Sequence, residues 1–169
     1  CGQELDKAKE TLEKLRGDLV AAGVPVRDIS TAFIHVAELN DGAADLTSAE
    51  RGVLEKLLTY GPRRDGHEPH GLLQVVAPRP GTISPWSSKA TDIARQCGLE
   101  GLVRRIERCT AYHVDGDGDL GPALPLLHDR MTEAVLTSLD QADVLFRHVA
   151  PKPLSEIDVL ARGRAAVEE

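Results

Sequence analysis

The first part of the chain carries apolar residues at helical spacing. They recur every three or four positions among charged residues, at Leu5, Ala8, Leu12, Leu15 and Leu19. This spacing places them on one face of a helix, and Gly23 followed by Pro25 predicts where that helix ends. From Asp28 to Leu39 the chain is rich in β-branched and aromatic residues, which predicts a strand.

A second helix is predicted from a capping signal. Thr47 is followed three residues later by Glu50, and in this arrangement each side chain accepts from the other residue's backbone N–H. The pair Gly61–Pro62 predicts the stop, and residues 63–70 are polar and predict a loop. The apolar face of this helix consists of Val53, Leu54, Leu57 and Leu58.

A short strand and a third helix are predicted next. The strand, Leu72–Val76, runs into Pro78, which cannot donate to a central ladder. The helix is expected to have Ser87 or Ser88 as its cap and Gly98 at its exit. Its apolar stripe is predicted at Ala90, Ile93, Ala94 and Cys97.

Alternating residues from Leu102 to Val114 predict a long third strand, which a loop of aspartates and glycines follows. Pro122 or Pro125 suits the first turn of a fourth helix, because the missing N–H is harmless there. A short helix capped by Asp140 is expected to reach Phe146. The buried stripe of the fourth helix is predicted at Leu126, Leu127, Met131, Ala134 and Val135.

This order of elements predicts an α+β fold, with helices packed on a mostly antiparallel sheet. Helix–strand–helix–strand is followed by helix–strand–helix, which indicates a structural duplication without a sequence repeat. Two prolines make a stiff break at Ala150–Pro153, so we place a domain boundary near Pro151, between residues 1–150 and 151–169. The missing initial Met and the unterminated helical pattern at the end predict that the chain is a piece of a longer protein.

Composition and charge narrow the function classes. With 41% hydrophobic and 28% charged residues the chain is expected to fold. A net charge of −7 argues against nucleic-acid binding, and alternation along the third strand separates Arg105 from Arg104 and Arg108. The sequence has neither an apolar run long enough to cross a membrane nor a signal peptide, so we expect a cytoplasmic protein whose cysteines are reduced thiols.

One segment carries a family resemblance. From Val75 to Asp92 the sequence reads V-V-A-P-R-P-G-T-I-S-P-W-S-S-K-A-T-D, followed by I-A-R-Q-C-G-L and later by V-R-R-I-E-R. This run resembles the amino-terminal part of the large, single-chain formylglycinamidine ribonucleotide synthases. Two departures are the absence of a first strand before helix one and the unmatched loop Asp115–Gly121. Further matches cover Val24–Asn40, Leu54–Pro62, Tyr112 and Leu127–Met131.

The resemblance implies a part of a cytosolic ligase of purine biosynthesis. That enzyme transfers ammonia from glutamine to formylglycinamide ribonucleotide and uses ATP with magnesium. The family's catalytic residues belong to later domains, so we expect neither a catalytic residue nor a bound cofactor here. The fold implied is that of a fused dimer of the small subunit used by multi-subunit synthases. Its role would be to dock the synthetase and glutaminase domains and to organise the ammonia channel, and residues 151–169 would begin the linker.

A candidate site lies where the second strand runs into the third helix. Free N–H groups and the helix dipole at such a start can hold an anion. The alternative is that the serines cap the helix while Trp86 and two prolines stiffen a packing loop, with Trp86 as an interface anchor. The residues predicted for anion binding or domain docking are Arg79, Gly81, Ser84, Trp86, Ser87, Ser88 and Lys89.

Other candidate chemistry is weaker. The loop Asp115–Gly121 lacks the glycine and glutamate that a calcium loop requires, and the His67/His70 pair has no further ligands for a metal. His35 and His113 are expected to be sheet residues, and Cys97 and Cys109 to be small buried hydrophobes. The competing function is a stand-alone ferredoxin-like module that binds a phosphorylated metabolite at Ser87–Lys89.

Overall fold

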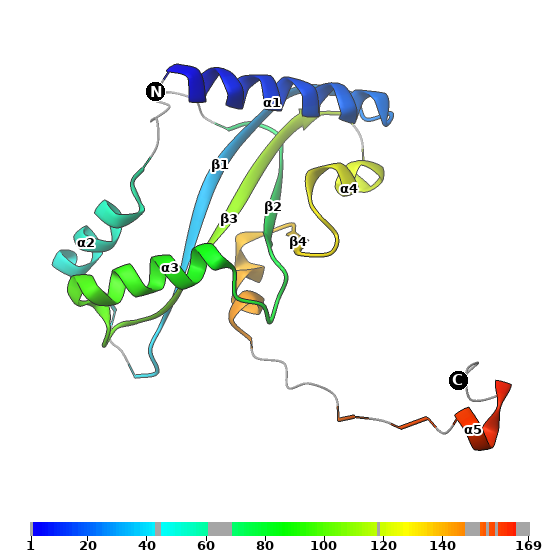
Figure 1. The fold of residues 1–169 in the computed structure, drawn as a ribbon. Coiled ribbons are helices and arrows are strands. Elements are labelled where there is room, and N and C mark those ends of the chain that lie inside the picture. The colour runs from blue at the N-terminus through cyan, green and yellow to red at the C-terminus, as the bar shows by residue number, and fades with distance from the viewer. Residues whose placement is uncertain are drawn as a thin grey trace.

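The sheet confirms the predicted α+β class and its antiparallel character. The computed structural model describes residues 2–42, 45–60, 69–117, 119–147, 153–154, 156–157 and 159–164. In these residues four strands form one sheet in the order β1-β3-β2-β4, with every neighbouring pair antiparallel (Figure 1). The strands are β1 (Val26–Leu39), β2 (Leu72–Pro78), β3 (Val103–Gly116) and β4 (Glu133–Leu136).

The helices lie mainly on one side of this sheet. None of the described helices is both long and apolar enough to cross a membrane. A 3-10 segment, Leu139–Phe146, follows β4, and α5 lies apart from the sheet (Figure 1). The helices are α1 (Gly2–Ala21), α2 (Ser48–Leu58), α3 (Pro85–Ala94), α4 (Leu124–Leu127) and α5 (Val159–Arg162).

The two longest strands, β1 and β3, pair with each other, with β1 at the edge of the sheet. Each has 14 residues, and their register runs from Val26 opposite Gly116 to Leu39 opposite Val103. Residues directly opposite each other share a sheet face, so this register decides which side chains meet. It is shifted near both ends of the pair.

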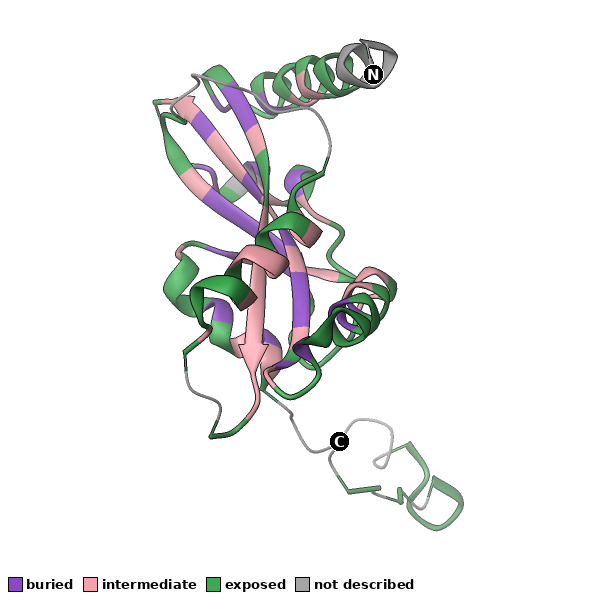
Figure 2. Ribbon diagram, turned by 90° about the vertical axis from the view of Figure 1, so that its left-hand side faces the viewer, coloured by how far each residue is buried: buried purple, intermediate pink, exposed green. Residues whose placement is uncertain are grey.

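The core consists of three apolar clusters. On one face, Val114 packs beneath α1 and α4, and Ile106 packs beneath α2 and α3. These two residues are eight positions apart on β3, and the even spacing keeps them on the same face. On the opposite face Cys109 and Val75 pack against the 3-10 segment. Figure 2 shows the buried positions concentrated along the strands.

Several local predictions are confirmed. Thr47 and Glu50 make both bonds of the capping box at the start of α2. Gly23 adopts a φ of 88° just after α1, a left-handed conformation that glycine takes without steric cost. The 3-10 segment is capped by Ser138 rather than by Asp140, because the Ser138 hydroxyl accepts from the Asp140 N–H.

The prediction of a fourth helix is wrong beyond the first turn of that helix. Helix α4 ends at Leu127, and Met131 is 78% exposed rather than buried. The predicted stripe residues Ala134 and Val135 lie in β4, which pairs with the edge of β2. An unpaired backbone edge offers hydrogen bonds to a short apolar segment, and this long-range pairing outweighed the helical spacing.

The predicted stripe of α3 is also displaced. Ile93 is 44% exposed and Cys97 is exposed, whereas Ser87, Thr91 and Ala94 are buried. The helix therefore turns two hydroxyl-bearing residues toward the sheet. After Ala94 the chain continues as a π-helix, Arg95–Leu99, and Gly98, the predicted exit, adopts a φ of 89° there.

Candidate functional site

The segment that links β2 to α3 is fixed by its own capping bonds. Ser84, not Ser87 or Ser88, is the N-cap of α3, and its side-chain oxygen accepts from the Ser87 N–H at 3.0 Å. Pro85 explains the shift. Proline suits the first helical position and holds the residue before it in the extended conformation that an N-cap requires.

Helix α3 replaces a neighbouring strand at the edge of β3. The pairing of β2 with β3 ends at Val76 opposite Thr110, so the N–H and C=O of Ile106 have no strand partner on that side. The Ser87 hydroxyl donates to Ile106 O at 2.6 Å, and Ile106 N donates to the Thr91 hydroxyl at 3.0 Å. These two buried side chains satisfy backbone groups that would otherwise be costly to bury.

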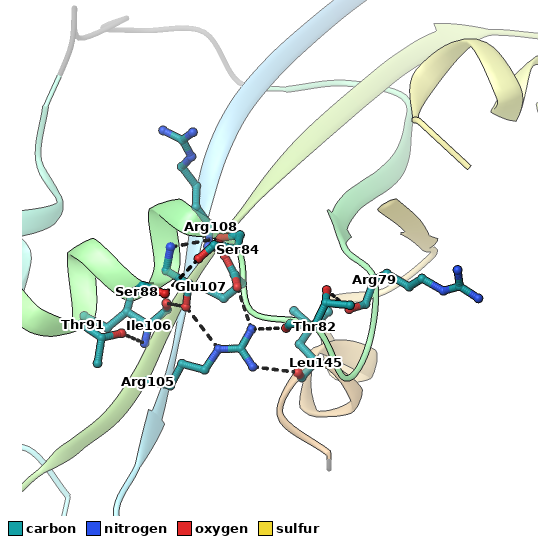
Figure 3. A network of polar contacts seen from close by, with 11 residues as sticks. Arg79, Thr82, Ser84, Ser88, Thr91, Arg105, Ile106, Glu107, Arg108 and Leu145 are labelled. Carbon is teal, nitrogen blue, oxygen red and sulfur yellow. Dashed lines mark hydrogen bonds and ion pairs between the residues drawn. The ribbon is translucent and has the colours of Figure 1, made fainter. Parts of the chain in front are cut away.

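Beside this edge lies a buried ion pair between Arg105 and Glu107, called here the buried pair. Arg105 Nη2 lies 2.7 Å from Glu107 Oε2, with the side chains 15% and 0% exposed respectively. The other carboxylate oxygen of Glu107 accepts from the Ser84 hydroxyl at 2.7 Å and from Arg108 N at 3.0 Å. The buried carboxylate thus has three donors (Figure 3).

The guanidinium of Arg105 connects three segments of the chain. It donates to Thr82 O at 2.7 Å in the segment before α3 and to Leu145 O at 3.3 Å in the 3-10 segment. Its Nε donates to the Ser87 hydroxyl at 3.1 Å. Because these contacts are internal to the chain, the buried pair fixes the fold around the candidate site and directs no polar group outward.

An exposed aromatic cluster lies on the other face of the sheet, formed by Phe33, His35, Tyr60, Trp86 and Arg108. The Arg108 guanidinium carbon lies 4.5 Å from the centre of the Phe33 ring and 5.0 Å from that of Trp86. His35 Nε2 hydrogen-bonds the Tyr60 hydroxyl at 2.9 Å. Phe33 is 55% exposed and Tyr60 is 47% exposed, so the cluster is open to solvent.

The charge of this cluster comes from Arg108. Burial, and then the charge of Arg108, lowers the pKa of His35 below its usual 6.5, so the imidazole is neutral at neutral pH. Cross-strand pairing places His35 opposite Arg108, which brings the two side chains together on one face. Figure 3 shows the Arg108 side chain pointing away from the buried pair.

The predicted site residues separate into an internal and an external group. Ser84 and Ser87 use their hydroxyls within the chain, and the Ser88 hydroxyl makes a long contact to Ser84 O at 3.4 Å. The Arg79 side chain is exposed and points away from the buried pair (Figure 3).

The three other predicted residues, Gly81, Trp86 and Lys89, lie in or directly before α3. Lys89 is exposed on α3, and Gly81 is exposed with a φ of 80° in the turn before it. Trp86 lies in the aromatic cluster, partly buried. The structure therefore brings Ser84, Ser87 and the buried pair together, whereas Arg79 and Lys89 are exposed.

The other candidate residues are the aspartates of the Asp115–Gly121 loop, the histidines and the cysteines. Asp115 and Asp117 face Arg27, with the closer contact at 2.9 Å, and no metal-ligand group of three occurs within the described ranges. His67 lies outside the described residues. Cys109 is buried as predicted, and burial followed by the charge of Glu107 raises its pKa to about 11.

The sequence reasoning missed both clusters. The R-I-E-R run was noted only as a split basic patch, although residues two apart in a strand share a face and opposite charges there can pair. The aromatic cluster depends on the β1–β3 register and on the placement of α2 and α3, which no local pattern shows.

The comparison with protein families agrees with this architecture. A family model described as "Formylglycinamide ribonucleotide amidotransferase N-terminal" matches residues 32–146, which is more than half of the chain. The matched range runs from within β1 to the end of the 3-10 segment, so it includes the buried pair and the aromatic cluster. The chain therefore belongs to the formylglycinamide ribonucleotide amidotransferase N-terminal family.

Proposed function

We propose that this chain is a docking domain that positions the synthetase and glutaminase parts of a formylglycinamide ribonucleotide amidotransferase and thereby organises ammonia delivery between them. Family membership makes it the amino-terminal part of an enzyme of purine biosynthesis. The chemistry, including the use of ATP and magnesium, belongs to other domains in this proposal. The enzyme acts in the cytoplasm, and a linker begins near Pro151, which lies outside the described residues.

The observation that carries the docking role is that the main polar cluster is closed on itself. Glu107 is 0% exposed and receives its hydrogen-bond donors from within the chain, and the Ser87 hydroxyl donates to the edge of β3. A substrate site needs polar groups that remain available to a ligand. The aromatic cluster, by contrast, exposes rings and an arginine, which are enriched among the residues that dominate protein–protein binding.

The same closed cluster counts against the metabolite-binding alternative. A phosphate at the start of α3 requires free N–H groups and hydroxyls. The side chain of Ser84 already accepts from the Ser87 N–H, and Ser84 O accepts from the Ser88 N–H at 3.1 Å.

The topology supports a fused-dimer origin. The order α1–β1–α2 is repeated as α3–β3–α4. The two corresponding strands, β1 and β3, are equal in length and pair antiparallel, with β1 at the edge of the sheet.

A donor comparison in the full-length enzyme tests this function. Turnover is measured with glutamine and then with ammonia as nitrogen donor, in the parent enzyme and in the Trp86→Ala variant. We expect the substitution to lower turnover with glutamine and to spare turnover with ammonia. An equal loss with both donors would place the segment at the synthetase active site instead, and no loss with either would reduce Trp86 to packing.

A further inference from the structure

The positive charge of Arg108 has no carboxylate partner in the part of the chain that the structure describes. Ion pairs of the sheet and the segments packed on it involve Arg27, Arg95, Arg104, Arg105 and Arg147. Glu107, the acidic residue next to Arg108 in sequence, is engaged by Arg105 at 2.7 Å. Among the described residues, the R-I-E-R run therefore leaves one positive charge without a carboxylate, and that charge lies on the aromatic face.

The aromatic rings hold this guanidinium in place without accepting hydrogen bonds from its N–H groups. Phe33 and Trp86 lie against its carbon at 4.5 and 5.0 Å. Its only hydrogen bond within the described residues is a long one, from Nη1 to the Tyr60 hydroxyl at 3.4 Å. A guanidinium carries five N–H donors in a planar fork. The geometry thus fixes the fork and leaves most of its donors open.

We propose that Arg108 is the anchor for a carboxylate on another domain of the same enzyme, with Phe33, Tyr60 and Trp86 packing around the incoming side chain. This assignment rests on the proposed docking function and names its contact point. A planar guanidinium matches the two oxygens of a carboxylate in a bidentate pair. The surrounding rings exclude water from such a pair, which is how the central contacts of protein interfaces are built.

The charge balance favours a carboxylate over a phosphate group. His35 adds no charge at neutral pH, because burial and Arg108 lower its pKa. One guanidinium neutralises one carboxylate, whereas a phosphate group would bring a charge of about −1.5 to −2 into a site that offers one positive charge. The exposed rings of Phe33 and Tyr60 also suit an acidic side chain with apolar neighbours.

Zero-length cross-linking of the full-length enzyme tests this anchor. In the Arg108→Lys variant, a carbodiimide joins the new amine to any carboxylate in direct contact, and mass spectrometry identifies the linked peptide. We expect a link from position 108 to an Asp or Glu of another domain. The matched control is Arg104→Lys, because Arg104 faces Glu38 at 3.7 Å and Asp41 at 3.8 Å within this domain and should link to them.

Two results would overturn the proposal. One is a control that links as expected while position 108 forms no link, or a link only within residues 1–150. The other is a link between two copies of the chain, detected by mixing isotopically light and heavy enzyme, which would make the cluster a self-association surface.

The activity of an Arg108→Met variant separates this proposal from the docking function. We expect turnover with glutamine to fall roughly tenfold, as a loss of about 1.4 kcal/mol in docking produces, while turnover with ammonia is spared. If Arg108→Met behaves like the parent enzyme but Trp86→Ala loses turnover with glutamine, the docking function stands without Arg108 as its anchor.

Discussion

Removing the cation from the buried pair is expected to destabilise the fold strongly. In an Arg105→Met variant the Glu107 carboxylate, 0% exposed, loses its positive partner and keeps only the donors from Ser84 and Arg108 N. The carbonyls of Thr82 and Leu145 lose their shared donor as well. Methionine preserves much of the apolar stem of arginine, so the change isolates the charge and its hydrogen bonds.

The expected cost follows from this burial. Breaking a buried ion pair on one side costs about 3–5 kcal/mol, because an uncompensated charge stays in the interior. Each kcal/mol lowers the melting temperature of a domain of roughly this size by about 2–4 °C. The variant should therefore melt about 6–20 °C below the parent chain.

Two companion variants make the result specific. Arg104→Met removes an exposed arginine whose partners lie at 3.7 and 3.8 Å, so its cost should stay below about 1 kcal/mol. Arg105→Met/Glu107→Gln removes both charges and keeps an oxygen that accepts from Ser84 and Arg108 N. This double variant should recover at least half of the loss.

Urea denaturation of the chain, followed by circular dichroism, measures these free energies of unfolding. The reasoning is refuted if Arg105→Met costs no more than Arg104→Met. It is also refuted if the double variant is as unstable as the single one, because the penalty would then not come from a stranded carboxylate.

Two further predictions concern titratable groups. The pKa of His35 lies below 6.5 in the folded chain, so the unfolded chain binds the proton more readily. The stability that His35 contributes is therefore present above pH 6.5, and it is lost as the pH falls toward the folded pKa. NMR titration should show a higher pKa for His35 in Arg108→Met, and an unchanged pKa would contradict the stated role of the arginine. Iodoacetamide should modify the exposed Cys97 much faster than the buried Cys109, whose pKa is raised to about 11. In a Cys1→Ser background, equal labelling of both thiols would show that Cys109 is accessible.

The sequence predicted most of the elements because their signals are local. The Thr47–Glu50 capping box and the apolar stripe of the first helix depend on residues within a few turns. The structure confirms the box and the stripe positions Leu12, Leu15 and Leu19, whereas Ala8 is exposed. The alternation from Leu102 to Val114 likewise predicted β3, although the strand extends to Gly116. Short-range physics, in which each side chain meets its neighbours along the chain, is enough for such elements.

The errors arose where a partner distant in sequence decides the structure. Ala134 and Val135 read as a helical stripe, but β2 offers them an edge to pair with. Ser87 read as a cap, but Pro85 moves the cap to Ser84 and frees the Ser87 hydroxyl for β3. The proline was a local signal that could have been used, whereas the edge of β2 was not visible in the sequence.

The candidate site was predicted in location but not in composition. Trp86 is predicted to be an interface anchor and lies in the aromatic cluster, where its partners His35 and Arg108 come from β1 and β3. A local sequence motif can identify one residue of such a cluster, here Trp86. The register of β1 against β3, which places His35 opposite Arg108, gives the others.

The most direct test of the docking role is the ratio of turnover with glutamine to turnover with ammonia. It is measured in the full-length enzyme with and without Trp86→Ala. Lys89→Ala is the matched control, because Lys89 is exposed on the same helix and belongs to neither cluster. The docking role predicts that the ratio falls in Trp86→Ala and stays at the parent value in Lys89→Ala. A ratio unchanged in Trp86→Ala, whether both rates fall together or neither does, would contradict it.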